Sequence, residues 1–231
     1  MKSALALTLQ TLLFTAVLTA ADAPAPPQAA PFYALPAVGA WAEFQCTSRG
    51  PDGKETVGTL LLRRTADVEI KGQPCASVEV KFTADRKAPD RWKLRRLAVS
   101  GERFRRTGDL TKSVVEAHQQ SGGEDAARPM DDAPLASFLR MGFARTMPLE
   151  KQGGVEELTT PAGKWQCQQL KGSGTEGDRR EQYAVWLCPD TPFGFCQFTV
   201  TVEQAKPLSK SSFNATLVRV GTAPAAPQKL R

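Results

Sequence analysis

Residues 57–83 read VGTLLLRRTADVEIKGQPCASVEVKFT, and this stretch decides the fold. Apolar and polar side chains alternate along Val57–Arg63 and again along Ala76–Thr83. A period of two is typical of a strand that buries one face. Lys71-Gly72 lies between the two segments and suits a tight turn, because glycine accepts a positive φ. The stretch therefore predicts two antiparallel strands joined by a short turn.

The same alternation recurs along most of the chain. It predicts further strands at Trp41–Thr47, Arg91–Val99, Glu102–Arg106, Lys164–Leu170, Gln182–Cys188, Phe195–Val202 and Phe213–Val220. Turns are expected at Gly50–Gly53, Ser100-Gly101 and Gly172–Gly174. Short strands joined by tight turns form an antiparallel meander, and a twisted sheet of this many strands curls. We expect a mainly β domain: a single strongly curved antiparallel sheet, a half-barrel, with one or two helices against its concave face.

One segment breaks the alternation. After a polar loop at His118–Arg128, Asp131-Asp132 can cap a helix that has Pro134 in its first turn and ends near Met147. Its apolar residues recur at helical spacing, so we expect this helix to lie as a lid on the concave face. Methionine adapts to irregular apolar partners. The lid and two tryptophans are therefore candidate binders of an apolar ligand: Met130, Leu135, Phe138, Leu139, Met141, Phe143, Met147, Trp165 and Trp186. The alternative is that this Met and Phe stripe is plain core.

Four regions are distinguished along the chain. Residues 1–23 combine Lys2, an apolar run and the small residues Ala21-Asp22-Ala23, which is the pattern of a cleaved signal peptide. Residues 24–37 are a Pro/Ala-rich linker, residues 38–221 the β-rich domain, and residues 222–231 a flexible tail. No later stretch approaches the ~20 apolar residues of a spanning helix. We therefore expect a periplasmic or secreted protein without a transmembrane segment in the mature chain.

The composition excludes several classes of protein. The chain has 231 residues, of which 41% are hydrophobic and 23% charged, and these fractions argue against collagen, a coiled coil, a multi-span membrane protein and a disordered chain. It contains a single histidine, His118, which excludes metal sites built on several histidines. Metal ligands and cofactors are not expected. Nucleic acid is a poor partner for an exported protein.

The chain has five cysteines and no Cys-x-x-Cys pair. An oxidising compartment favours disulfides over metal thiolates. Cys188 and Cys196 flank residues 189–195 symmetrically, so they could meet across the neck of a turn between two strands. This pair is the disulfide candidate. The competing interpretation is that the cysteines are small buried hydrophobes.

Positive charge gathers between Asp85 and Arg106. This segment holds nine Lys or Arg residues against three acidic ones, and the excess equals the +6 of the whole chain. A hairpin turning at Ser100-Gly101 would give one basic face that meets an anionic envelope component, with these candidates: Arg91, Lys93, Arg95, Arg103 and Arg105. The alternative is a solvated face that protects a sheet edge.

Enzyme chemistry finds little support. His118 lies in a polar stretch, and the sequence contains neither a Gly-x-Ser-x-Gly elbow nor a phosphate-binding glycine loop. Asp131-Asp132 is already explained as a helix cap. We expect no catalytic residues.

Four motifs carry a resemblance to a known family. Val38–Phe44, Thr160–Cys167, Val185–Leu187 and Pro189–Gly194 resemble a recurrent pattern in exported bacterial proteins of the LolA/LppX-like kind. The resemblance implies an unclosed, strongly bent antiparallel sheet with helices in its hollow. It also implies carriage of a lipid or a lipoprotein acyl chain. The chain departs from these carriers in having a single helical segment over the opening.

Three hypotheses of function follow. The first is a non-enzymatic cell-envelope protein that binds an apolar ligand, such as a lipid or acyl chain, under the helical lid. The alternative is a structural or protein-interaction module with a filled core that docks through its basic face. The third is a hydrolase that uses His118.

Overall fold

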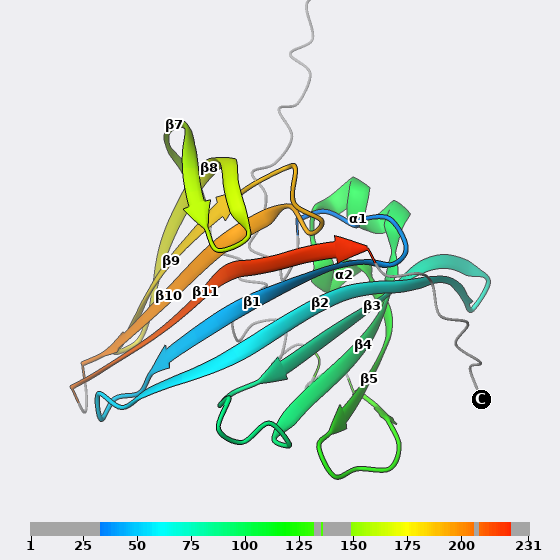
Figure 1. The fold of residues 1–231 in the computed structure, drawn as a ribbon, viewed down its shortest axis with the longest axis horizontal. Coiled ribbons are helices and arrows are strands. Elements are labelled where there is room, and N and C mark those ends of the chain that lie inside the picture. The colour runs from blue at the N-terminus through cyan, green and yellow to red at the C-terminus, as the bar shows by residue number, and fades with distance from the viewer. Residues whose placement is uncertain (1–32, 132–134, 136–148, 206–207, 223–231) are drawn as a thin grey trace, which may run out of the picture.

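The computed structural model describes residues 33–131, 135, 149–205 and 208–222. Its strands form one antiparallel sheet in the order β6-β5-β4-β3-β2-β1-β11-β10-β9-β8-β7 (Figure 1). The end strands β6 and β7 do not pair with each other, so the sheet stays open. The expectation of a mainly β, unclosed and curved sheet is confirmed.

Except for the two-residue β6, the strands are long, and they follow one another as a meander. Their bounds are β1 Ala40–Arg49, β2 Glu55–Ile70, β3 Gln73–Thr83, β4 Trp92–Ser100, β5 Val114–Ser121, β6 Arg128–Pro129, β7 Glu150–Thr160, β8 Gly163–Glu176, β9 Arg179–Leu187, β10 Phe195–Gln204 and β11 Ser209–Thr222. Two short helices, α1 Gly101–Thr107 and α2 Leu110–Ser113, connect β4 to β5. The first strand, β1, pairs with the last strand, β11, so the two ends of the domain lie together in the middle of the sheet.

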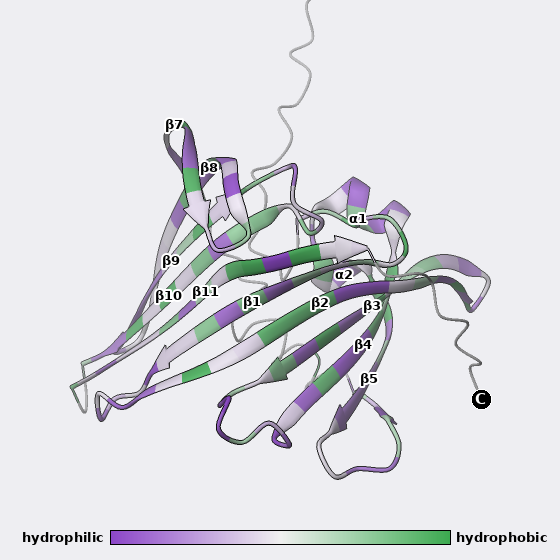
Figure 2. Cartoon of the chain, in the orientation of Figure 1, coloured by the Kyte–Doolittle hydropathy of each residue, from purple (hydrophilic) through white to green (hydrophobic). Residues whose placement is uncertain are grey.

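Alternation along the strands gives the sheet one buried face, which we call the inner face. It carries Phe44, Leu60, Val78, Leu97 and Leu217, each at most 1% exposed. Register places Phe44 opposite Leu217 and Leu60, and Val78 opposite Leu97, so these side chains leave the sheet on the same side. Figure 2 shows the resulting apolar and polar bands along the ribbons.

The sheet bends toward this inner face. Phe82 on β3 and Phe213 on β11 have ring centroids 6.2 Å apart, although β2 and β1 lie between their strands. Three inter-strand steps span about 14 Å in a flat sheet, so the rings meet because the sheet is curved. Gly58 on β2 leaves room at this end: a Cβ there would lie 2.1 Å from the backbone oxygen of Thr83.

The predicted strand at Glu102–Arg106 is wrong, because this segment is helix α1. The Ser100 side chain accepts a hydrogen bond from the Arg103 amide at 3.4 Å, as a helix N-cap does. Gly108, with φ 61°, ends the helix as its C-cap. Ser100-Gly101 is therefore the entry to a helix and not the turn of a hairpin.

Other local predictions also need correction. Gly172–Gly174 lies inside β8 and is not a turn, and the chain turns after Glu176 instead. The first four residues of the expected polar loop at His118–Arg128 are strand, since β5 runs to Ser121. Strand β7 was not expected at all. The turns at Gly50–Gly53 and Lys71-Gly72 are confirmed.

The N-terminal part of the described chain is attached to the domain. The amides of Tyr33 and Ala34, in the expected linker, donate to the Phe193 carbonyl at 2.8 and 3.3 Å. The predicted signal peptide lies outside the described residues, as does the tail beyond Thr222. The described part of the chain has no helix that is both long and apolar enough for a membrane span.

Replacing Ser100 by alanine tests the helix cap. We expect Ser100→Ala to lower the free energy of unfolding by about 1 kcal/mol, because the Arg103 amide loses its acceptor. Urea unfolding measures the change. The control is Ser212→Ala, at an exposed position of β11, which should leave stability within ~0.5 kcal/mol. Equal effects would show that Ser100 does not cap α1.

Candidate functional site

The inner face is an apolar surface built from nearly every strand. Its fully buried members include Phe44, Leu60, Leu62, Val78, Val80, Leu97, Val99, Leu170, Val185, Phe198, Ala215 and Leu217. At roughly 25 cal/mol per Å² of buried apolar area, such a set is the main stabilising term of the domain.

Aromatic rings run across this face. Phe44 stacks on Phe195 with centroids 4.7 Å apart, and Phe195 contacts Phe198 at 5.8 Å. Phe198 in turn lies 5.5 Å from Phe213 and 6.3 Å from Tyr183. The rings connect β1, β9, β10 and β11, so they hold the middle of the sheet in its curved form.

Segments outside the sheet pack against this core. Phe104 of α1 and Leu110 of α2 are buried in it, and Tyr33 and Leu35 are partly buried against it. The Met130 amide donates to the Ala117 carbonyl at 2.8 Å, which fixes the chain after β6 beside β5. These residues form the described part of the cover over the inner face.

The structure describes two of the residues predicted for the lid, Met130 and Leu135. Met130 and Leu135 pack against the inner-face core. The Leu135 amide donates to the Asp131 carbonyl at 3.0 Å, one helical turn from the expected cap. The remaining lid residues lie outside the described residues: Phe138, Leu139, Met141, Phe143 and Met147.

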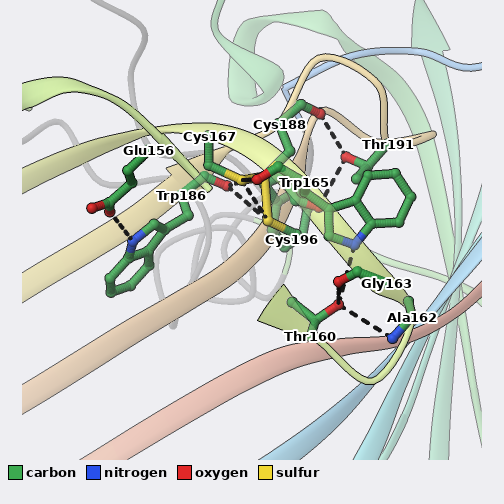
Figure 3. Close-up of a disulfide and its surroundings, with 11 residues drawn as sticks. Glu156, Thr160, Ala162, Gly163, Trp165, Cys167, Trp186, Cys188, Thr191 and Cys196 are labelled. Atoms are coloured by element: carbon green, nitrogen blue, oxygen red, sulfur yellow. Dashed lines mark hydrogen bonds between the residues drawn. A yellow bond between two sulfur atoms is a disulfide. The ribbon is translucent and has the colours of Figure 1, made fainter. Parts of the chain in front are cut away.

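The two predicted tryptophans are held at the β7–β9 end of the sheet. Trp165 donates its indole N–H to Thr160 Oγ1 at 3.1 Å, and Trp186 donates to Glu156 Oε1 at 3.0 Å (Figure 3). Both are partly buried against the core. They flank the cysteine cluster described below, whereas Met130 directly follows β6, at the other end of the strand order.

The basic residues do not form a hairpin face. Arg103 and Arg105 lie on helix α1, while Lys93 and Arg95 lie on β4 and Arg91 directly precedes it. The expected common face of five residues is therefore wrong, because the segment after Ser100 is helical. These basic residues lie close together in the sequence, but the fold divides them between strand β4 and helix α1.

Register gives the β4 residues a position that the sequence analysis missed. Arg95 lies opposite Val80 and Lys93 opposite Phe82, and both of these partners belong to the inner face. Lys93 and Arg95 thus continue the line of Leu97 and Val99 on the same side of β4. The i, i+2 spacing from Leu97 was the signal that could have shown this.

Burial affects Arg95. Its side chain is partly buried among inner-face neighbours, and this desolvation lowers the pKa of the guanidinium. An arginine still carries its charge at neutral pH. Lys93 is exposed at the end of the strand. The inner face therefore changes from apolar to cationic along a single strand.

Three buried cysteines lie in one cluster. Cys188 forms the expected disulfide contact with Cys196 and an equivalent contact with Cys167 (Figure 3). The Cα atoms are 6.0 Å apart in the first pair and 4.6 Å in the second, and both values suit a disulfide. Sequence reasoning missed Cys167, because nothing in a separation of 21 residues signals that it meets Cys188.

The other two cysteines are buried and unbonded. Burial raises the pKa of Cys46 to about 12, with a smaller opposing effect of Arg86, and burial also raises the pKa of Cys75. Both are therefore neutral thiols, as expected for small buried hydrophobes.

A cavity of about 520 Å³ opens between β7, β8, β9 and β10. Its lining includes Glu150, Lys171, Ser173, Gln182, Thr199 and Thr201. Register places Lys171 and Thr199 opposite Ala184, one residue away from Val185 and therefore on the other face of the sheet. This polar cavity is not the hollow expected under the lid.

The single histidine has an ordinary environment. His118 lies on β5, with Nδ1 3.5 Å from Glu116 Oε1. It pairs with Arg96 and Pro129 in the sheet. Among the described residues, no serine, threonine or cysteine side chain makes a hydrogen bond to it, so the hydrolase hypothesis gains no support.

Comparison with known proteins gives only distant likenesses. No family model and no curated protein matches the chain. A protein of Bacteroides fragilis NCTC 9343, classed provisionally as exported with a YmcC-like fold, is 14% identical and has a TM-score of 0.39. That match covers 83% of this chain and 99% of the other.

Two further solved structures are similar to a comparable degree. A provisionally classed lipoprotein of Parabacteroides distasonis ATCC 8503 is 9% identical, with a TM-score of 0.37, over 84% of this chain and 100% of that one. A DUF1329 family protein of Desulfovibrio piger ATCC 29098 is 11% identical, with a TM-score of 0.38, over 81% and 86%. At TM-scores below 0.5 these likenesses carry no argument about function.

The high pKa of Cys46 predicts its reactivity. At pH 8 we expect iodoacetamide to modify Cys46 about a thousandfold more slowly in the native protein than in urea, because only the thiolate reacts. Peptide mass spectrometry measures both rates, and the unfolded chain serves as the reference. Rapid modification in the native state would mean that Cys46 is neither buried nor protonated.

Proposed function

We propose that this is a non-enzymatic, exported protein of the cell envelope that binds an apolar chain carrying an anionic group on its inner face. Export rests on the signal-peptide pattern of residues 1–23. The single observation that supports the ligand is the line of residues on β4, where Val99 and Leu97 lead to Arg95 and Lys93 on the inner face. An amphiphile has this same order of apolar and charged parts.

The apolar part of such a ligand fits the inner face. The buried side chains there come from strands on both sides of the β1–β11 pair. Among them are the apolar residues Phe44, Leu60, Val80 and Leu217. A lipid acyl chain gains its binding free energy from this kind of burial. Met130 and Leu135 would contact it from the opposite side.

The anionic part fits the cationic end of β4. A headgroup carboxylate or phosphate beside Arg95 would pair with a guanidinium that is already partly desolvated. Charge-assisted hydrogen bonds of this kind are stronger than neutral ones. Gln119, opposite Arg95 on β5, offers an amide beside it.

Loading requires movement of the cover. The inner-face side chains are at most 1% exposed around Phe44 and Leu60, so a ligand has to take the place of chain segments that now touch them. Among the residues predicted for the lid, Met130 and Leu135 are the described ones that pack against this core.

Charge reversal on the inner face tests the proposal. With cis-parinaric acid, an anionic fluorescent fatty acid, we expect Arg95→Glu and Lys93→Glu each to raise Kd about tenfold, which corresponds to ~1.4 kcal/mol. The methyl ester of the same acid should bind all variants alike, because it lacks the charge. The matched control is Lys81→Glu on β3, whose ammonium lies over Trp92 on the outer face.

Two results would contradict the proposal. One is a purified protein that binds neither probe and that carries no extractable lipid in native mass spectrometry. The other is an equal loss of affinity in Lys81→Glu and Arg95→Glu, because the effect would then be one of net charge.

A docking module remains the second candidate, since the inner face is already filled by the chain itself. In that case the cations outside the inner face bind the partner, and Arg105 is exposed on α1, a different element from the β4 residues Lys93 and Arg95. We expect the double variant Arg91→Glu/Arg105→Glu to lose binding to anionic phosphatidylglycerol vesicles at low salt, while Arg95→Glu keeps it. Co-sedimentation measures this, and unchanged binding in the double variant would exclude docking through these residues.

A further inference from the structure

The cluster of Cys167, Cys188 and Cys196 contains one sulfur more than a disulfide can use. Cys188 Sγ makes a disulfide contact with each of the other two, and Cys167 Sγ lies 3.0 Å from Cys196 Sγ. A sulfur atom forms one disulfide at a time. We propose that the protein holds a single, exchangeable disulfide at Cys188, which alternates between Cys167 and Cys196 as its partner.

The chemistry favours a disulfide and a thiol over a three-thiolate metal site. All three cysteines are fully buried, and the hydrogen-bonding atoms at the sulfurs are carbonyl oxygens. Trp165 O is 3.6 Å from Cys167 Sγ, and Trp186 O is 3.4 Å from Cys188 Sγ. Carbonyl oxygens accept from an S–H and repel a thiolate. A neutral disulfide and a neutral thiol avoid the cost of burying negative charge.

The exchange is balanced and needs no oxidant. Starting from the Cys167–Cys188 form, the Cys196 thiol loses its proton, its sulfur moves into line with the Cys167–Cys188 bond, and its thiolate attacks Cys188 Sγ. The new S–S bond forms as the old one breaks, and the electron pair leaves on Cys167 Sγ, which takes up a proton. The net change is one proton moved from Cys196 to Cys167. Because the carbonyl oxygens disfavour the thiolate, exchange is slow in the closed protein.

The two forms restrain different parts of the fold. The Cys167–Cys188 bond joins β8 to the end of β9, strands that are already paired beside it at Gln168 and Leu187. The Cys188–Cys196 bond instead closes the loop between β9 and β10. In the first form no disulfide closes this loop, which is held by the buried Phe193 and by hydrogen bonds such as Cys188 N to Gly194 O at 2.9 Å and Thr191 Oγ1 to Cys188 O at 2.8 Å.

The loop carries the attachment of the N-terminal segment. Phe193 O accepts from the amides of Tyr33 and Ala34, and the Tyr33 ring contacts Phe195 at 6.1 Å. The choice of disulfide therefore sets how firmly residues 33 and 34 are held at the edge of the inner-face core. Exchange would therefore change how firmly this part of the cover is attached, and this change needs no ligand on the inner face.

Disulfide mapping of the full chain, isolated from an oxidising compartment, tests the proposal. The protein is quenched in acid, its thiols are alkylated and it is digested with pepsin, which can cut between Cys188 and Cys196 at Phe193. We expect both cross-links, Cys167–Cys188 and Cys188–Cys196, together with three free thiols per chain. A single cross-link in all samples, or five thiols with a bound metal ion, would overturn it.

Trapped variants test the consequence for the N-terminal segment. Cys196→Ser holds the protein in the first form, Cys167→Ser in the second, and Cys75→Ser, outside the cluster, is the matched control that keeps both. We expect hydrogen exchange at the Tyr33 and Ala34 amides to be about tenfold faster in Cys196→Ser than in Cys167→Ser, because only the latter loop is covalently closed. Equal exchange rates in the two variants would contradict the coupling.

Discussion

The inner face has to be buried, and the curvature of the sheet is the way this chain achieves it. A flat sheet of eleven strands would expose one apolar side, whereas bending lets side chains from distant strands bury one another. The contact between Phe82 on β3 and Phe213 on β11 shows this directly, since two strands lie between them. A glycine makes this bend feasible. A Cβ at Gly58, on the intervening β2, would lie 2.1 Å from the backbone oxygen of Thr83. The helices and the cover are arranged around this bend.

The open edges of the sheet follow from the same constraint. A sheet that bends without closing leaves two end strands whose backbone groups could pair with another chain. At one end, β6 is only two residues long and contains Pro129, which has no amide hydrogen to donate. At the other end, β7 is exposed along most of its length and carries charged side chains, among them Glu150, Lys151 and Glu157. The short, proline-containing β6 and the exposed, charged β7 therefore both oppose edge-to-edge association.

Period-two alternation predicted the strands that bury one face, and it failed where that signal is weak or ambiguous. Strand β7 is exposed on both faces over most of its length, so it has no apolar period to detect. In Glu102–Arg106, Phe104 is the only apolar residue, and one residue cannot distinguish a period of two from a period of 3.6. The cap at Ser100 settled that segment as helix. For the candidate site, helical spacing predicted a lid on the concave face and Met130 and Leu135 pack against the core, but the inner-face position of Arg95 required the register with Val80. Register depends on contacts between strands, which a single chain sequence does not display.

The curved core and the cysteine cluster are linked through Phe195. Its ring stacks on Phe44 of β1 and contacts Tyr33, while the next residue is Cys196. The pairing of β10 with β9 is irregular between Phe195 and Gln197, so that Phe195 and Cys196 are both buried in place of the usual alternation. This irregularity directs the ring into the inner-face core and the sulfur toward Cys188. A change at Cys196 therefore affects Phe195, which contacts both the sheet and its cover. The apolar face and the disulfide choice are physically connected at this point of the fold, although one concerns a ligand and the other concerns covalent bonding.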